Sequence, residues 1–242
     1  MPLHAPVYGP REATDHEAIW HKGIWIKFEA NPEFAKWLVP EPLEYVSNKM
    51  AIMIAERRQP PALGYAFFTT LFMPVKFQGM QGGYCPIGFS DSDEMIIGYR
   101  EHYGFGIVGC DRTHLFYDGN TIAATVTRRQ ETILKASIYL EEKEAGDVLK
   151  EILGRGTFQL QKIPCMDKSK TIRRVLSPHY GRGPNTTVKE KWSGRAALEF
   201  PPSVWGLHKL NPVTVERGIF MEITINYQDV GAKVLWEEIG EA

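Results

Sequence analysis

The chain has 242 residues, of which 43% are hydrophobic and 24% are charged, a composition typical of a folded globular protein. Its 28 basic and 29 acidic residues give a formal net charge of −1, so charge gives no indication of a nucleic-acid partner or of binding to an anionic membrane. The three cysteines lie far apart, which argues against a disulfide framework.

The N-terminal segment contains three prolines and lacks the charged and apolar regions of a signal peptide. We therefore expect an N-terminal arm over residues 1–18, followed by a single domain over residues 19–242. No apolar run in the sequence approaches the roughly 18 residues needed to cross a bilayer. These features predict a cytoplasmic protein with no membrane partner.

The first half of the chain predicts strands and one short helix. Residues 24–28 alternate between apolar and polar side chains, as a half-buried strand does. Asn31 is suited to cap a helix that has Pro32 at its first position. Residues 50–55 form a short apolar run, and apolar or aromatic runs predict further strands at residues 65–72, 75–81, 84–89 and 94–97.

The second half of the chain predicts a hairpin, one longer helix and a series of strands. Asp118-Gly119 favours a tight turn between strands at 115–117 and 121–127. Residues 141–153 carry glutamates in the first turn and an apolar stripe, which is typical of a helix. More strands are expected at 133–140, 157–163, 171–176, 186–193, 196–200, 213–227 and 232–237. The strand count predicts a mainly β, barrel-like antiparallel sheet with one principal helix.

A glycine-rich stretch at residues 98–109 follows the strand predicted at 94–97 and combines charged, aromatic and imidazole side chains. Glycines at this density let the backbone leave a sheet sharply and approach a ligand closely. The stretch therefore indicates a site, with a bulge carrying an ordinary surface ion pair as the alternative.

Four segments, in order along the chain, resemble the acetoacetate decarboxylase family. They are Val39-Pro40-Glu41-Pro42-Leu43-Glu44, Arg100-Glu101, Lys191-Trp192-Ser193-Gly194 and Leu210-Asn211-Pro212-Val213. The resemblance implies a cone-like β-barrel whose interior forms the ligand pocket, in a homo-oligomer. It also implies an enzyme whose lysine condenses with a ketone to form an imine.

The chain departs from the family at the positions that carry this chemistry. The family's Pro-Lys-Lys triplet corresponds to Gly106-Ile107-Val108, so the imine-forming amine is missing. The family's pocket arginine corresponds to His21 or Lys22, and its pocket glutamate falls within residues 67–70, which contain no carboxylate. By position, the pocket is apolar and aromatic and favours a hydrophobic or aromatic substrate.

Two histidines are the candidates for acid–base chemistry, because imidazole can exchange a proton near pH 7. The predicted catalytic residues are His21, His102 and Glu101. An ordinary hydrogen-bonded histidine is the alternative for each imidazole, and a structural ion pair is the alternative for Arg100-Glu101. The predicted substrate-binding residues are Trp20, Arg57, Tyr65, Phe68, Phe89, Arg100, Tyr103, Phe105 and Ile107.

Three functions remain open from the sequence. The first is a lyase, dehydratase or isomerase that uses acid–base chemistry on a carbonyl compound. The second is imine chemistry at a relocated lysine, such as Lys22, Lys27 or Lys76, and the third is a barrel that binds a small molecule without catalysis. The seven histidines are scattered without metal-ligand spacing, so we expect neither a metal nor a cofactor.

Overall fold

A computed structural model describes residues 17–59, 64–143, 156–164, 169–180, 186–227 and 229–241. The large sheet has 11 strands: β1 (Glu17–Glu29), β2 (Glu44–Tyr45), β3 (Lys49–Gln59), β4 (Gly64–Phe77), β5 (Met80–Ser90), β6 (Ile107–Gly109), β7 (Arg112–Asp118), β8 (Thr121–Arg128), β9 (Glu131–Lys143), β12 (Thr186–Glu199) and β13 (Thr214–Tyr227). A second sheet has three: β10 (Gln159–Pro164), β11 (Lys170–Tyr180) and β14 (Asp229–Glu241). The helical segments are α1 (Pro32–Trp37), α2 (Asp93–Ile97), the π-helical η1 (Gly98–His102) and the 3-10 helix η2 (Leu207–Leu210).

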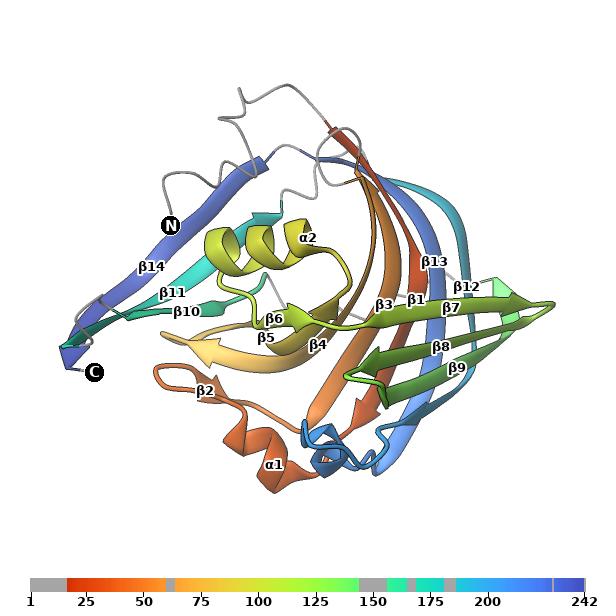
Figure 1. Ribbon diagram of the computed structural model, residues 1–242, viewed down its shortest axis with the longest axis horizontal. Helices are drawn as coiled ribbons and strands as arrows, with labels where there is room; N and C mark the ends of the chain where they lie inside the picture. The colour runs from red at the N-terminus through yellow and green to blue at the C-terminus, as the bar shows by residue number, and fades with distance from the viewer. Residues whose placement is uncertain are drawn as a thin grey trace.

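The large sheet curls into a half-barrel (Figure 1). Its strand order is β6-β5-β4-β3-β1-β13-β12-β9-β8-β7, with β2 beside β4, and its pairings are antiparallel except that of β5 with β6. The last strand, β7, returns to contact β3 and β4. There the Tyr117 hydroxyl donates a hydrogen bond to Glu56 at 2.9 Å. The predicted mainly β, barrel-like fold is therefore confirmed.

Strands β1, β3 and β4 bury side chains on both of their faces. On the inner face, Ile24, Ile26 and Phe28 of β1 join the main core inside the curled sheet. On the outer face, Met53 and Phe68 belong to a second cluster, which α2 covers. Because successive strand residues point to opposite faces, adjacent residues of β1 pack into different clusters.

One glycine fixes how closely β1 approaches β3. A Cβ at Gly23 would lie 2.3 Å from the Ile54 carbonyl oxygen and 2.6 Å from the Ala55 Cα. Since both atoms are backbone, no side-chain rotation relieves the clash. We expect Gly23→Ala to lower the free energy of unfolding by about 3 kcal/mol in urea titrations.

Gly240 provides the matched control for this substitution, because a Cβ there meets no heavy atom within 4 Å. Gly240→Ala should change the free energy of unfolding by no more than about 0.5 kcal/mol. Equal stability of the two variants would contradict the close approach of β1 to β3.

Several predicted elements differ from the structure. Residues 94–97 were predicted as a strand, which is wrong, because they form α2: the Ser92 side chain accepts from the Met95 amide at 3.2 Å and caps the helix. The strand predicted at 75–81 spans the turn between β4 and β5, and the strands predicted at 186–193 and 196–200 are one strand, β12. The helix predicted at 141–153 begins on residues of β9, and its remainder lies outside the described residues.

Other expectations agree with the structure. The Asn31 side chain accepts from the Phe34 amide at 3.0 Å and caps α1, whose first residue is Pro32. The hairpin of β7 and β8 turns at Gly119, which has a φ of +55°. Of the predicted N-terminal arm, residues 1–16 lie outside the described residues and residues 17–18 begin β1.

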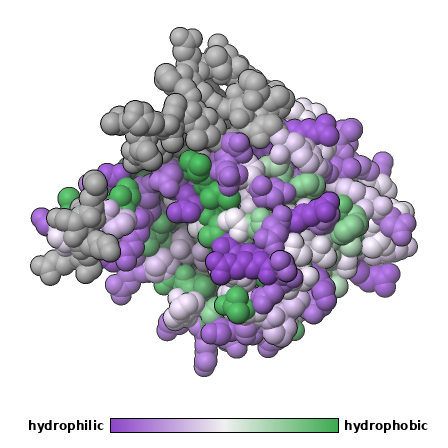
Figure 2. Space-filling model, viewed as in Figure 1, coloured by the Kyte–Doolittle hydropathy of each residue, from purple (hydrophilic) through white to green (hydrophobic). Residues whose placement is uncertain are grey.

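The surface viewed in Figure 2 is largely hydrophilic, and hydrophobic residues appear on that face as small groups among polar ones. Within the described ranges, no helix combines the length and the apolar composition needed to span a membrane.

Candidate functional site

Side chains from four parts of the chain meet on the outer face of β1, β3 and β4, beneath α2 and η1. We call this group the outer site; its members are His21, Arg57, Phe68, Tyr99, Phe105 and Ile107. His21 on β1 lies directly opposite Arg57 on β3. The imidazole ring meets the Phe68 ring edge-on, with centroids 5.6 Å apart and an interplanar angle of 76°. The outer site thus joins an imidazole and a guanidinium to an aromatic wall.

The environment of His21 keeps its imidazole neutral. Burial, together with the positive charge of Arg57, lowers the pKa of His21 from 6.5 to about 3. Both effects act against the imidazolium form, since a cation loses hydration on burial and is repelled by a neighbouring cation. At pH 7 the ring can therefore donate one hydrogen bond and accept another, but it binds a proton only weakly.

Arg57 and Tyr99 form the polar link between the sheet and the helical segment. The Arg57 side chain is 5% exposed, and its Nη1 donates a hydrogen bond to the Tyr99 hydroxyl. The guanidinium also lies 5.5 Å from the centroid of the Tyr99 ring. Tyr99 in turn meets the Phe105 ring edge-on, at 5.3 Å between centroids. These contacts place a permanent cation next to the neutral imidazole.

The deep wall of the outer site is apolar, with one hydroxyl. Ile107 is fully buried in the same cluster as Phe68 and Phe105. A Cβ on Gly88 would lie 3.1 Å from Ile107 Cγ1 and 3.2 Å from Thr70 Cγ2, so these two side chains flank Gly88. Thr70 is 2% exposed, and its hydroxyl has no hydrogen-bond partner in the described structure. A buried donor without a partner is costly unless another polar group reaches it.

The lowered pKa of His21 predicts a pH dependence of stability. Between pH 3 and 6.5 the unfolded chain binds a proton at His21 that the folded chain does not, so stability falls as the pH falls through this window. Between pH 7.5 and pH 5, the free energy of unfolding of the wild type should fall by about 1–2 kcal/mol more than that of His21→Gln, because glutamine has no proton to bind. Urea unfolding of both proteins at the two pH values measures this difference.

Proton NMR tests the same point directly. The imidazole signal that disappears in His21→Gln should keep its chemical shift between pH 8 and pH 5 in the folded wild type. A midpoint between pH 6 and 7 for that signal would show that the ring is solvated, and would contradict the described environment.

The structure separates the other predicted site residues. Tyr103 stays beside the outer site, with its ring 5.7 Å from that of Tyr99. Arg100 and Glu101 are exposed on η1, outside the outer site. Only the backbone of His102 is described. The residues that lie on the inner face instead are Trp20, Tyr65 and Phe89.

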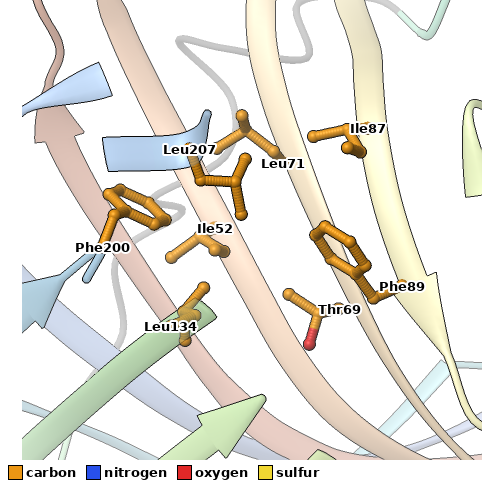
Figure 3. Close-up of a pocket in the computed structure, with 8 residues that line it drawn as sticks. All are labelled: Ile52, Thr69, Leu71, Ile87, Phe89, Leu134, Phe200 and Leu207. Carbon is orange, nitrogen blue, oxygen red and sulfur yellow. The ribbon is translucent and has the colours of Figure 1, made fainter. Parts of the chain in front are cut away.

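The main core contains a small cavity on the inner face (Figure 3). Its volume is about 10 Å³, enough for one water molecule. Its lining residues are Ile52, Thr69, Leu71, Ile87, Phe89, Leu134, Phe200 and Leu207. This cavity is too small for a carbonyl substrate. Phe89 lines it, whereas Phe68 and Ile107 lie in the outer site.

Among the residues that the structure describes, neither a metal site nor a lysine is found in the outer site. Within the described ranges, no three histidine, cysteine, aspartate or glutamate side chains lie close enough to hold a metal ion. Lys22 lies over the Tyr117 ring on the inner face, Lys27 pairs with Glu216 at 2.9 Å, and Lys76 is exposed. None of these three lysines belongs to the outer site.

The sequence predictions missed Tyr99, which is a member of the outer site, and Thr70, which lies next to it. A signal for Tyr99 exists in Ser92-Asp93-Glu94, which is a helix start. Once residues 93–103 are taken as helical, Tyr99 and Tyr103 fall on one side of the helix. Thr70 lies between Phe68 and Phe72, two outer-face residues of β4, and strand alternation would have placed it with them.

Comparison with known protein families gives a match along nearly the whole chain. The family model for acetoacetate decarboxylase (ADC) matches residues 1–234. Acetoacetate decarboxylase 1 of Bradyrhizobium diazoefficiens is 27% identical over 207 residues, which cover 84% of this chain and 78% of that protein. The acetoacetate decarboxylase of Burkholderia vietnamiensis is 25% identical over 217 residues, which cover 88% and 82%.

Solved structures share the fold. One from structural studies of acetoacetate decarboxylase has a TM-score of 0.82 at 21% identity and covers 98% of this chain and 94% of its own. The enduracididine biosynthesis enzyme MppR, complexed with the condensation product of pyruvate and imidazole 4-carboxaldehyde, has a TM-score of 0.78 at 12% identity, with coverage of 96% and 92%. An acetoacetate decarboxylase-like enzyme from Sphingomonas wittichii RW1 has a TM-score of 0.78 at 13% identity, covering 95% and 97%.

Proposed function

The chain belongs to the acetoacetate decarboxylase family, and on that premise we propose that it is an enzyme that works at the outer site without an imine. Its substrate is a hydrophobic or aromatic carbonyl compound, and its reaction is that of a lyase, dehydratase or isomerase. The observation that carries this proposal is the pairing of a neutral His21 with the buried cation Arg57 in an aromatic cluster. Ile107 and Val108, in place of lysines, support a mechanism without an imine.

The chemistry follows from the charges in the site. When the carbon next to a carbonyl group gives up a proton to hydroxide from the solvent, water is formed and negative charge develops on the carbonyl oxygen of the resulting enolate. Hydrogen-bond donors and cations fixed at that oxygen lower the barrier, and they act strongly where water is excluded. His21 supplies a neutral donor, Arg57 a positive charge, and the Thr70 hydroxyl a further donor next to Ile107.

Two features bear on the substrate. The rings of Phe68 and Phe105 favour an apolar or aromatic group, and Arg57 favours a carboxylate. MppR, which shares the fold, has been solved with pyruvate and with a pyruvate condensation product, which supports a carbonyl acid as ligand.

The outer site is closely packed, so substrate entry requires α2 and η1 to move away from the sheet.

Binding without catalysis is the second candidate, and the apolar side chains of Ile107, Phe68 and Phe105 in the outer site favour it. Proton exchange separates the two functions. In deuterium oxide at pH 7, the enzyme should speed exchange of the protons next to the carbonyl of 4-phenyl-2-oxobutanoate, followed by proton NMR. Saturable binding of this compound without faster exchange would favour the binding barrel, and neither binding nor exchange would contradict its substrate class.

A further inference from the structure

On the inner face of the same strands, charged and aromatic side chains form two rows across the sheet. We call them the rim cluster; its members are Trp20, Lys22, Glu56, Arg58, Tyr65, Tyr117, Lys189 and Glu222. In one row Arg58 lies opposite both Trp20 and Tyr65. In the other row Lys22 lies between Glu56 and Glu222. Tyr117 of β7 closes over this second row through its hydrogen bond to Glu56.

Both carboxylates of the rim cluster accept hydrogen bonds from side chains other than Lys22 and Arg58. Glu56 accepts hydrogen bonds from the hydroxyls of Tyr65 and Tyr117. Burial, reinforced by this carboxylate, raises the pKa of both phenols, so they stay protonated and keep donating. Glu222 accepts from Trp20 Nε1 at 3.1 Å and from Lys189 Nζ at 2.5 Å. Burial alone would raise the pKa of Glu222, but these two donors lower it.

The two central cations are consequently held by rings rather than by carboxylates. Lys22 Nζ lies 4.2 Å from the centroid of the Tyr117 ring and 5.9 Å from that of Phe220. The Arg58 guanidinium lies 5.3 Å from the rings of both Trp20 and Tyr65. Neither cation forms an ion pair in the described part of the chain. A cation–π contact uses the face of a ring rather than a carboxylate, so the positive charge of each cation can still pair with an anionic ligand.

The rim cluster is also accessible to a ligand. Tyr65 is 47% exposed and Tyr117 is 44% exposed, so their rings offer apolar surface beside the two cations. Lys22 and Arg58 are diagonal neighbours on adjacent strands, a spacing of roughly 7–8 Å between backbones. Their long side chains can therefore reach one small group from two sides. With Lys189, the cluster carries three cations and two carboxylates, an excess of positive charge.

We propose that the rim cluster is a binding site for a small planar carboxylate, separate from the outer site. Lys22 and Arg58 hold the carboxylate of the ligand between them. The exposed rings of Tyr65 and Tyr117 receive its flat apolar body. The ligand class is an aromatic or conjugated monocarboxylic acid. Because the site lies on the opposite face of β1 and β3 from His21 and Arg57, it can be occupied independently of the outer site.

Calorimetry with benzoate tests this proposal. Wild type should bind one benzoate at the rim cluster with a dissociation constant of about 1 mM or tighter, as expected for so small a ligand. Lys22→Met and Arg58→Gln should each weaken that binding by about tenfold or more, since each removes a charge-assisted hydrogen bond. Lys22→Arg, which keeps the charge, should retain binding. Benzamide, of the same shape without the charge, should bind at least about tenfold more weakly than benzoate.

Two controls distinguish this site from the rest of the protein. Lys36→Met removes an exposed cation on α1, at the other end of β1 (Figure 1), and should leave benzoate binding unchanged. His21→Gln, an outer-site change, should also leave it unchanged. Loss of binding in His21→Gln with full binding in Lys22→Met and Arg58→Gln would overturn the proposal. Absence of any benzoate binding by folded wild type would overturn it as well, and would leave the proposed function of the outer site untouched.

Discussion

His21→Ala should slow the exchange of protons next to the carbonyl of 4-phenyl-2-oxobutanoate by about 10²–10³-fold, the loss typical of one removed donor to a developing oxyanion. The physical reason is the position of His21 between Arg57 and Phe68, where its ring is desolvated and neutral. A hydrogen bond to an oxygen that gains charge is stronger in such a place than in water. Proton NMR of purified, folded variants measures the exchange rate directly.

His21→Gln decides which role the imidazole has. The sequence alone favours a proton-transfer group, and a base at this position should lose nearly as much in His21→Gln as in His21→Ala. A pKa of about 3 favours the donor role instead, because a base is most effective when its pKa lies near the working pH. Since glutamine can still donate, His21→Gln should keep exchange within about tenfold of wild type. Full activity of His21→Ala would remove His21 from the mechanism altogether.

Wild-type protein incubated with acetoacetate and borohydride should show no added mass. Imine formation needs an uncharged amine in contact with the carbonyl, and the outer site presents Ile107 where the family resemblance implies a lysine. No lysine in the described part of the chain is a member of that site, and Lys27 is held by Glu216. Intact mass spectrometry after reduction gives an all-or-none answer. A stoichiometric adduct on any lysine would establish imine chemistry and contradict the proposed mechanism.

Ile107→Lys supplies the positive control for that experiment. The new amine would lie among Phe68, Phe105 and Met95, where burial favours its uncharged, nucleophilic form. We expect this variant, if circular dichroism shows it folded, to be trapped by borohydride. Val108→Lys is the matched variant, because Val108 packs against the main core on the other face, and it should not be trapped.

The sequence predicted the architecture better than the local geometry of the site. Strand alternation, the Asn31 cap and the family segments were sufficient for a barrel-like antiparallel sheet. The segment at 94–97 was assigned the wrong structure because Met95, Ile96 and Ile97 form a short apolar run, and such runs do not distinguish a strand from a helix. The cap at Ser92 decides the matter in the structure.

Which side chains share a site depends on phase within each strand. Trp20 and His21 are adjacent in the sequence, yet Trp20 bonds to Glu222 on the inner face while His21 contacts Phe68 on the outer face. Tyr65 and Arg57 are separated in the same way. A list of pocket residues drawn from approximate position therefore mixes two faces, and alternation along each strand sorts them once the face of one residue is known.

The place of β1 in the middle of the large sheet affects how the chain is made. β1 can pair with β3 soon after both leave the ribosome, but its other neighbour, β13, is synthesised about two hundred residues later: Trp20 and Glu222, which share a hydrogen bond, are 202 positions apart. Throughout that interval one edge of an apolar strand has no partner. Such long-range pairing slows folding, and an open edge can pair with a second chain. A translational pause shortly before β13 would therefore extend the period of greatest exposure to aggregation.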